Sequence, residues 1–365
     1  MTTVGLLVLA ISVVALQKPP ISPEVHPDRS VTFRLVDPGA TKVELGLEGA
    51  DSVPMTRDGN GVWSYTTGPL APDIYGYSFN ADGQTRLDPQ NPSMVKPNLV
   101  WSGNMVLVPG DPAEPWERQN VPHGILHHHF YHSGVVGDDR DYFVYTPPGY
   151  KATARKKYPV LYLLHGYSDI ANGWTEVGKA NEILDNLIAQ GRAKPMLVVM
   201  TFGYGVPGYA SPNGGNRGPD VEKKNYDNYR ESLLKEVVPA VESDYRVKTD
   251  KADRAIAGLS MGGAETLYVG LNNLDTFSYV GAFSSGGLRD IETSFPGFDG
   301  AKANEKLKLL WVSCGTEDGL IRFNRTLVKW LKAKNANLQA LETPGRHTWM
   351  VWRRNLIAFS QQLFR

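Results

Sequence analysis

The sequence predicts two domains, a small β-sandwich followed by a larger α/β domain whose mostly parallel sheet is covered by helices on both faces. The length of 365 residues is sufficient for two domains, and 41% hydrophobic and 21% charged residues are typical of folded proteins. Short segments of alternating polarity, separated by turn residues, fill the first third of the chain. Apolar runs that alternate with segments of helical spacing fill the remainder.

A short apolar run opens the chain. It extends from Val4 to Leu16 and stops before Lys18, Pro19 and Pro20, which prevent a helix from continuing. A run of this length suits the core of a secretory signal and is too short to cross a bilayer easily. We therefore expect a signal peptide over 1–17 and a secreted or periplasmic protein. No later stretch approaches a membrane span, so no stable membrane insertion is expected after cleavage.

Residues 18–109 predict the sandwich. Their short segments alternate in hydrophobicity with a period near two, and the turn signature Asp37-Pro38-Gly39 separates two of them. Strands at this spacing are typical of an immunoglobulin-like β-sandwich. The proline-rich residues 110–120 then predict a linker between the domains.

Residues 121–365 predict the α/β domain. The run 158–164 shows no alternation, as expected of a strand that is buried on both faces. The glycine- and proline-rich segment 203–219 follows another such run, so we expect it to border the acyl site at the ligand-binding edge of the sheet. The expected strands are 142–146, 158–164, 196–200, 254–257, 309–313 and 338–342, and the expected helices are 182–190, 229–245, 264–271, 322–334 and 352–364.

A candidate nucleophile lies in the motif Gly258-Leu-Ser260-Met-Gly262, between an expected strand and an expected helix. A sharp turn at this place raises a serine hydroxyl clear of the sheet, and the turn leaves no room for side chains on the two flanking residues. The motif alone is common, but its strand–turn–helix context is specific. We expect Ser260 to be the nucleophile.

A serine hydroxyl needs an adjacent base, and in this arrangement the acid and then the histidine follow the serine along the chain. His347 is the only histidine after Ser260, so we expect it to be the base. Glu317 and Asp318 both follow an expected strand, and Asp318 is our choice for the acid that orients the imidazole.

Two main-chain N–H groups are needed to stabilise the oxyanion. We expect one from Met261, the residue after the nucleophile, and the other from Tyr167, in the loop after the first buried strand. Gly166 allows the close approach of that loop. His165 is expected to have a structural role there.

These motifs together resemble carbohydrate esterase family 1, the esterase-D-like group of α/β-hydrolases. The resemblance implies feruloyl esterase or acetylxylan esterase activity on plant cell-wall xylan, and it implies the same triad of Ser260, Asp318 and His347. The matching segments are 121–124, 145–150, 163–166, 185–188, 245–247, 258–263, 314–318 and 347–352.

The first domain is similar to early-set, family-48 carbohydrate-binding modules. Several aromatic residues are candidates for stacking on sugar rings, although packing in the core is the usual role of such residues: Trp63, Tyr65, Tyr77 and Trp101. In the second domain, Trp174 follows the oxyanion loop and Trp352 follows the expected base. We expect these two tryptophans to line the acyl pocket.

The composition argues against several other classes of function. Lys+Arg and Asp+Glu number 38 each, so the chain lacks the basic excess of a nucleic-acid binder. The single cysteine, Cys314, excludes an intramolecular disulfide and a cysteine-based metal site within the chain. A metal site on 127–129 is not expected, because neighbouring strand residues point to opposite faces, and we expect a polar strand near the domain junction instead.

We therefore expect a serine esterase that requires no metal and no organic cofactor, with acylated xylan, an oligosaccharide or a small aromatic ester as substrate. A siderophore trilactone esterase of the enterobactin type would use the same catalytic parts, as would an acyltransferase such as a mycolyltransferase. The alternative from a different class is a non-catalytic polysaccharide-binding protein, against which the complete triad argues.

Overall fold

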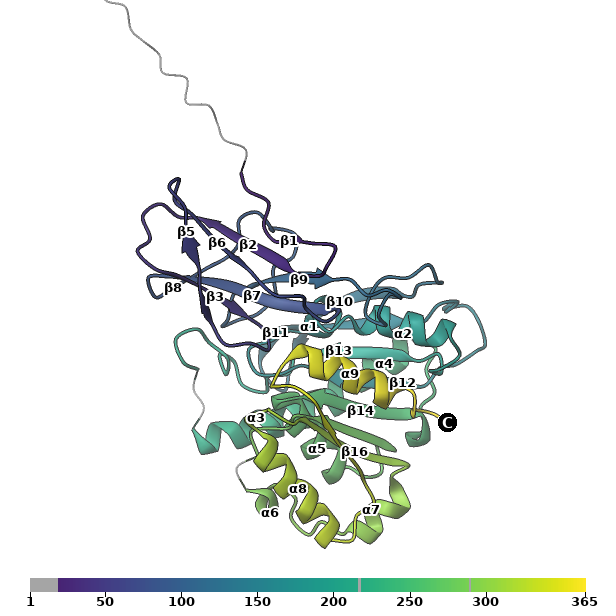
Figure 1. Ribbon diagram of the computed structural model, residues 1–365. Helices are drawn as coiled ribbons and strands as arrows, with labels where there is room; N and C mark the ends of the chain where they lie inside the picture. The colour runs from purple at the N-terminus through teal and green to yellow at the C-terminus, as the bar shows by residue number, and fades with distance from the viewer. Residues whose placement is uncertain (1–18, 216–217, 289) are drawn as a thin grey trace, which may run out of the picture.

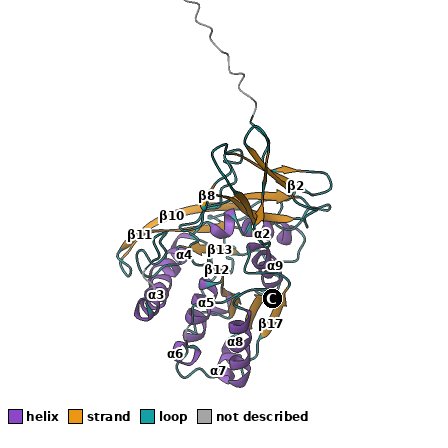
Figure 2. Cartoon of the chain, turned by 60° about the vertical axis from the view of Figure 1, so that its left-hand side comes forward, coloured by secondary structure: helices purple, strands orange, loops and turns teal. Residues whose placement is uncertain are grey.

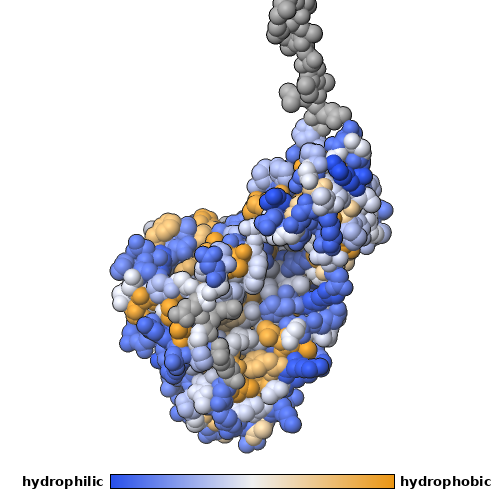
Figure 3. All heavy atoms as spheres, turned by 90° about the vertical axis from the view of Figure 1, so that its left-hand side faces the viewer, coloured by the Kyte–Doolittle hydropathy of each residue, from blue (hydrophilic) through white to orange (hydrophobic). Residues whose placement is uncertain are grey.

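The computed structural model describes residues 19–215, 218–288 and 290–365, so the expected signal peptide 1–17 lies outside it. Two antiparallel sheets, here called the front domain, precede a larger α/β domain, which confirms the predicted fold class (Figure 1). In the space-filling view the front domain is the smaller, upper lobe, and hydrophilic residues cover most of this face (Figure 3). In the described part of the chain, no helix has the length and apolar character needed to cross a membrane.

The two sheets of the front domain share one core. Their strand orders are β1-β2-β6-β5 and β4-β3-β7-β8, and β9 pairs with β7. Side chains on alternate positions point inward, so Val31, Phe33 and Leu35 pack together with Val43 and Leu45 of the other sheet. The strands are β1 (Glu24–Val25), β2 (Val31–Val36), β3 (Val43–Leu47), β4 (Val53–Pro54), β5 (Thr56–Arg57), β6 (Val62–Thr66), β7 (Asp73–Ala81), β8 (Gln84–Arg86) and β9 (Asn104–Val108).

The main sheet has the order β10-β11-β13-β12-β14-β15-β16-β17 among the described residues. β10 and β11 join antiparallel, and the pairs from β13 through β17 are parallel. Its strands are β10 (Ile125–Ser133), β11 (Asp138–Thr146), β12 (Val160–Leu164), β13 (Leu197–Thr201), β14 (Arg254–Leu259), β15 (Tyr279–Phe283), β16 (Leu309–Gly315) and β17 (Gln339–Thr343).

Helices cover both faces of this sheet (Figure 2). Residues of α1, α2 and α9 pack in the core cluster on one face, and residues of α3, α4, α5 and α8 pack in the cluster on the other. The helices are α1 (Gly173–Glu176), α2 (Ala180–Ala189), α3 (Pro219–Ser232), the π-helical turn η1 (Leu233–Val237), α4 (Val238–Asp244), the 3₁₀ turn η2 (Lys251–Asp253), α5 (Met261–Asn272), α6 (Ile291–Ser294), α7 (Gly300–Lys306), α8 (Ile321–Ala333) and α9 (Trp349–Ser360).

The strand order reverses between β12 and β14. From β12 the chain crosses to β13 on one side, and it then returns to β14 on the other side. The loops after β12 and β14 therefore leave the sheet in opposite directions, and a crevice forms between them at the carboxyl edge. Ligands bind in such a crevice in open α/β sheets. Tyr167 lies in the loop after β12, and Ser260 directly follows β14.

The histidine-rich strand β10 lies at the outer edge of the main sheet. β10 pairs with β11, and Phe130 on it is 77% exposed. His127 and His129 both contact the ring of Tyr245, whereas His128 pairs with Asp141. These different directions follow from the alternation of side chains along a strand.

The two domains meet along helix α9. Arg353 on α9 binds Asp73 of β7, with 2.6 Å between Nη2 and Oδ1, and both side chains are completely buried. The Glu48 carboxylate of the front domain accepts the N–H of Trp349 at 2.8 Å, at the start of α9. A second contact joins Arg346 to Asp51. The front domain therefore touches the segment that surrounds His347.

Candidate active site

Ser260 occupies the sharp turn between β14 and α5. Its φ of 52° lies in the left-handed region, which residues other than glycine rarely adopt. The glycines on either side of Ser260 are required because the turn leaves no room for a Cβ atom. A Cβ on Gly258 would lie 2.4 Å from the carbonyl oxygen of Gly262, and a Cβ on Gly262 would lie 2.4 Å from that of His165. The strained turn places Ser260 at the carboxyl edge of the sheet.

His347 connects Ser260 with Asp318. Its Nε2 lies 3.0 Å from Ser260 Oγ, and its Nδ1 lies 2.7 Å from Asp318 Oδ2. The second carboxylate oxygen of Asp318 accepts the N–H of Leu320 at 2.8 Å. Burial by itself would raise the pKa of Asp318, but the hydrogen bond and charge of His347 outweigh burial and hold this pKa below its usual range. Asp318 is thus ionised at neutral pH and orients the imidazole ring.

The neighbouring candidates take other positions. Glu317 is exposed, and its main-chain N–H bonds the carbonyl oxygen of Gly345. Cys314 is buried, and burial raises the pKa of its thiol to about 12, so the thiolate needed for nucleophilic attack does not form at neutral pH. The structure therefore brings Asp318, and not Glu317, into contact with His347.

The two tryptophans expected to line the acyl pocket lie in the core instead. Trp174 is completely buried, donates from Nε1 to the carbonyl oxygen of Leu164 at 2.8 Å, and packs edge-on against Trp349. Trp352 is 5% exposed and packs edge-on against His347, with 4.9 Å between ring centroids. Neither tryptophan lines the pocket that opens at Ser260. Both rings belong to the core cluster that includes α9, and only Trp352 contacts the ring of His347.

The loop after β12 approaches Ser260 closely. A Cβ on Gly166 would lie 2.6 Å from Cδ1 of Leu259 and 3.3 Å from Cβ of Ser260, so glycine favours this approach. His165 holds the loop, because its Nδ1–H donates to the carbonyl oxygen of Gly166 at 2.8 Å and its Nε2 accepts the N–H of Gly203 at 2.9 Å. Burial lowers the pKa of His165 to about 4, so the ring is neutral, as this bonding pattern requires.

A pocket of about 520 Å³ opens at Ser260. Its lining includes tyrosines from three segments, one leucine and one acidic side chain. Met261 and Tyr167, which were expected to supply the oxyanion N–H groups, both lie in this lining, and Tyr209 comes from the segment 203–219. The lining consists of Tyr167, Tyr209, Glu222, Tyr226, Ser260, Met261, Gly286, Gly287 and Leu320.

Glu222 and Tyr226 line the pocket but were not predicted from the sequence as site residues. They lie four residues apart on α3, so they project from one face of this helix. The sequence signal was available in this spacing, together with Pro219 at the first helical turn. The first turns of α3 are rich in charged residues, and the apolar periodicity that identifies a helix is therefore weak there.

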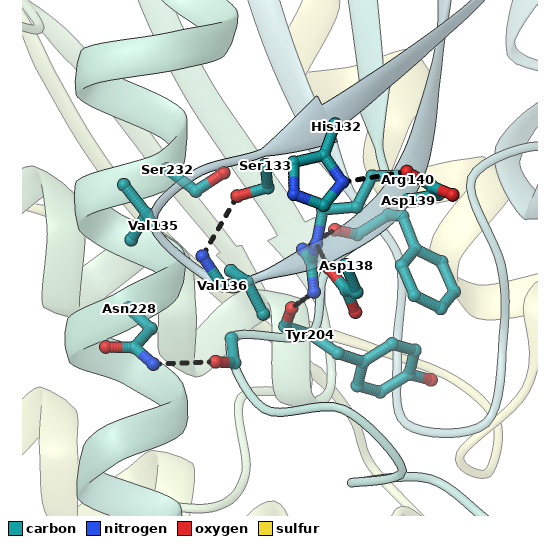
Figure 4. A network of polar contacts seen from close by, with 12 residues as sticks. His132, Ser133, Val135, Val136, Asp138, Asp139, Arg140, Tyr204, Asn228 and Ser232 are labelled. Atoms are coloured by element: carbon teal, nitrogen blue, oxygen red, sulfur yellow. Dashed lines mark hydrogen bonds and ion pairs between the residues drawn. The ribbon is translucent and has the colours of Figure 1, made fainter.

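The pocket wall is held from outside at the segment that follows β13 (Figure 4). Arg140 of β11 donates to the carbonyl oxygens of Phe202 and Tyr204. From α3, Asn228 Nδ2 donates to the carbonyl oxygen of Gly205 at 2.9 Å. Two different elements thus fix the main chain that leads into the wall containing Tyr209.

A buried carboxyl group lies behind the nucleophile. Glu265 on α5 is completely buried, and burial raises its pKa well above the usual range, which favours the protonated form. Its Oε1 lies 3.4 Å from Nδ2 of Asn225, whose Oδ1 accepts the N–H of Gly205 at 2.8 Å. Glu265 therefore links the helix after Ser260 to the segment that forms the pocket wall.

One group of metal-ligating side chains occurs among the described residues, and it lies outside the pocket lining. It comprises His123, Glu182 and Asp185. Glu182 already accepts from Arg118, and Asp185 accepts from the Tyr145 hydroxyl at 2.6 Å. Because a guanidinium beside the group opposes a second positive charge, these contacts describe a polar network that ties the segment before β10 to α2.

The chain matches a known family of esterases over much of its length. Residues 133–363 match the family model described as "Putative esterase", which is more than half of the chain. The chain belongs to this esterase family.

Known relatives of the esterase share its fold and part of its sequence. An endo-1,4-beta-xylanase/feruloyl esterase of Xylanibacter ruminicola is 32% identical over 350 residues, and the match covers 94% of this chain but only 46% of that relative. The structure of a CE1 ferulic acid esterase from Anaeromyces mucronatus is 28% identical, with a TM-score of 0.58 over 68% of this chain and 93% of that chain.

A third relative extends the likeness over the front domain. The enterobactin esterase from Shigella flexneri covers 92% of the esterase and 92% of its own chain, with a TM-score of 0.68. At 19% sequence identity this likeness shows the shared fold alone.

Proposed function

We propose that this esterase hydrolyses feruloyl esters of plant cell-wall polysaccharide, with Ser260 as the nucleophile. The observation that carries the proposal is the hydrogen-bonded line from Asp318 through His347 to Ser260, beside a pocket with aromatic walls. The names of two relatives include feruloyl or ferulic acid esterase, and the fungal relative has been solved in complex with ferulic acid.

The first half of the reaction transfers the acyl group to the protein. His347 Nε2 accepts the Ser260 hydroxyl proton while Oγ attacks the ester carbonyl carbon. The N–H groups of Met261 and Tyr167 stabilise the resulting oxyanion. When this intermediate collapses, the bond to the sugar oxygen breaks, and His347 gives its proton to that oxygen.

The second half releases the acid. His347 Nε2 accepts a proton from a water molecule, and the water oxygen attacks the acyl carbon on Ser260. The ester bond to Ser260 breaks, and Oγ recovers a proton from His347. Asp318 remains ionised throughout and stabilises the imidazolium in both halves. The sequence of steps uses no metal ion and no organic cofactor.

The pocket favours an aromatic acyl group over an acetyl group. An acetyl group would leave most of the volume of about 520 Å³ unfilled, whereas a phenylpropenoyl group presents a flat ring to tyrosine walls. Tyr209 and Tyr226 supply apolar ring surface, and the carboxylate of Glu222 is an acceptor suited to a phenolic hydroxyl. The walls therefore match an acid that combines an aromatic ring with a polar end.

A location outside the cytoplasm fits this substrate. Xylan is a polymer that a cell meets outside its membrane, and the apolar run at residues 4–16 has the character of a secretory signal. Equal numbers of acidic and basic residues suit an uncharged polysaccharide better than nucleic acid. We propose a secreted or periplasmic esterase that acts on acylated xylan or its oligosaccharides.

The test compares substrates on the full chain and on the Ser260→Ala variant. We expect hydrolysis of methyl ferulate and of feruloylated xylan, weaker release of acetate from acetylated xylan, and loss of all three activities in Ser260→Ala. Preference for acetylated xylan would overturn the feruloyl assignment. Activity on an enterobactin-type trilactone without activity on methyl ferulate would favour the siderophore esterase. Unchanged turnover in Ser260→Ala would remove Ser260 from the mechanism.

A further inference from the structure

A loop of the front domain lies against the oxyanion loop of the second domain. It comprises residues 96–103, between β8 and β9, and Asn98 makes the main contact. Asn98 Nδ2 donates to Ser168 Oγ and to Asp169 Oδ1, each at 2.9 Å. The N–H of Leu99 donates to the carbonyl oxygen of Ser168 at 2.7 Å. Three hydrogen bonds thus join this loop to the segment that carries Tyr167.

The same asparagine fixes the position of Trp101. Asn98 Oδ1 accepts the main-chain N–H groups of Val100 and Trp101, at 2.9 and 2.8 Å. The Trp101 indole then meets the ring of Tyr167 edge-on, with 6.0 Å between centroids. Because Tyr167 lines the pocket at Ser260, Trp101 stands directly outside the pocket wall.

Trp101 differs from the other aromatic candidates of the front domain in its exposure. Its side chain is 61% exposed, whereas Trp63 and Tyr77 are 7% and 3% exposed and pack in the sandwich core. An indole loses favourable burial when it stays open to water. Hydrogen bonds to the main chain keep Trp101 exposed at the margin of the pocket, where its indole offers an aromatic surface to a ligand.

We propose that Trp101 and Tyr167 form an outer subsite that binds a sugar ring of the alcohol half of the ester. This inference rests on the proposed function, in which the acyl half fills the pocket and the alcohol half stays outside it. A sugar ring has an apolar face of C–H groups that packs on an indole, and its hydroxyl groups remain in water at such an open site. The front domain then supplies part of the active site.

Further contacts make the front domain a rigid support for this subsite. Glu48 accepts the N–H of Trp349, and Asp51 binds Arg346, so the front domain also contacts both sides of His347. The completely buried pair of Arg353 with Asp73 belongs to the same interface between the domains. These contacts place Trp101 and the triad on two domains that are joined directly to each other.

The experiment measures kcat/KM of the full chain for a feruloylated xylo-oligosaccharide and for methyl ferulate, which lacks a sugar. For Trp101→Ala we expect about a tenfold loss on the oligosaccharide, mainly through KM, and a loss of at most about twofold on methyl ferulate. Trp101→Phe should recover much of the oligosaccharide activity because it restores an aromatic face. Phe130→Ala is the matched control, an exposed aromatic on β10 away from the pocket lining, and should leave both activities unchanged.

Equal losses on the two substrates, or no loss on the oligosaccharide, would overturn the subsite while leaving the esterase activity intact. Binding measured with the inactive Ser260→Ala variant separates the two proposals. If the wild-type protein hydrolyses neither ferulate ester, the proposed function fails. The sugar subsite would then still be supported if Ser260→Ala binds the oligosaccharide more tightly than Ser260→Ala with Trp101→Ala does, and it would fail if the two bind equally.

Discussion

Two buried carboxylates of this molecule each hold a basic side chain, but the surroundings of the two pairs are opposite. Asp318 holds His347, whose side chain is 35% exposed and whose second ring nitrogen faces Ser260. Asp73 holds Arg353, and both of these side chains are completely buried. The first pair is open to solvent at one end. Both members of the second pair are closed to solvent, and the half-exposed Arg354 contacts the other oxygen of Asp73.

This difference separates chemistry from stability. Arg353 also donates to the carbonyl oxygens of Ile74 and Val177, and a guanidinium does not release its proton in a protein. The closed pair can therefore only hold the domains together. The imidazole of His347 can accept and release a proton at its open end, so the same kind of contact supports catalysis there.

The largest effect is expected from breaking the open pair of Asp318 and His347. In Asp318→Asn, the amide no longer stabilises the imidazolium and favours the wrong tautomer of His347, so kcat for methyl ferulate should fall by about 10⁴-fold. Circular dichroism checks that the fold is unchanged. Glu317→Gln, the adjacent exposed carboxyl, is the control and should retain activity. A larger loss in Glu317→Gln than in Asp318→Asn would reverse the assignment of the acid.

The next largest effect is expected from breaking the buried pair of Asp73 and Arg353. Arg353→Met removes the buried partner of Asp73 and leaves only the half-exposed Arg354, 2.7 Å from Asp73 Oδ2, so the free energy of unfolding should fall by up to about 3–5 kcal/mol. Urea denaturation measures this change. Arg325→Met removes a matched but exposed ion pair, between Arg325 and Glu342, and should cost no more than about 1 kcal/mol.

A double variant sharpens the same comparison. Replacing both partners, with Asp73→Leu and Arg353→Met, removes the buried carboxylate together with its buried partner and should cost less than Arg353→Met alone. Equal costs for Arg353→Met and Arg325→Met would contradict the idea that enclosure makes the interdomain pair important.

A third prediction concerns His165, a histidine that is closed from solvent, unlike His347. Its pKa is lowered from about 6.5 to about 4, so its contribution to stability is present above pH 6.5 and is lost as the pH falls toward 4. Between pH 7 and pH 5, the wild-type protein should lose about 2 kcal/mol of unfolding free energy relative to His165→Asn, which cannot titrate there. Denaturation curves at the two pH values test this, and parallel losses in both proteins would contradict it.

The smallest expected effect is at Glu265. Because burial raises its pKa and favours the protonated form, Glu265→Gln replaces it with a neutral group of the same shape and should change the unfolding free energy by less than about 1 kcal/mol. Glu265→Ala, which leaves a cavity, should cost about 2–3 kcal/mol. Thermal denaturation compares the two. A loss in Glu265→Gln as large as in Glu265→Ala would show that the carboxylate is ionised.

Much of the fold could be predicted from local patterns, and the failures have identifiable causes. β15 was not expected, because Gly281 interrupts its short apolar run. In the structure the glycine is required by tertiary packing, since a Cβ there would lie 2.6 Å from the ring of Phe359 on α9. Helix α3 begins at Pro219, before the expected start at 229, because its polar first turns hide the helical period.

The sequence by itself determined the alternation of strands and helices, the turn at Ser260, and the order in which Asp318 and His347 follow it. These features depend on local backbone geometry, which the glycines and the chain order encode directly. Only the tertiary structure decided which aromatic residues meet solvent. Burial depends on segments far apart in the chain, so Trp174 and Trp352 are enclosed in the core, whereas the contact of Asn98 with the oxyanion loop keeps Trp101 at the surface beside the pocket.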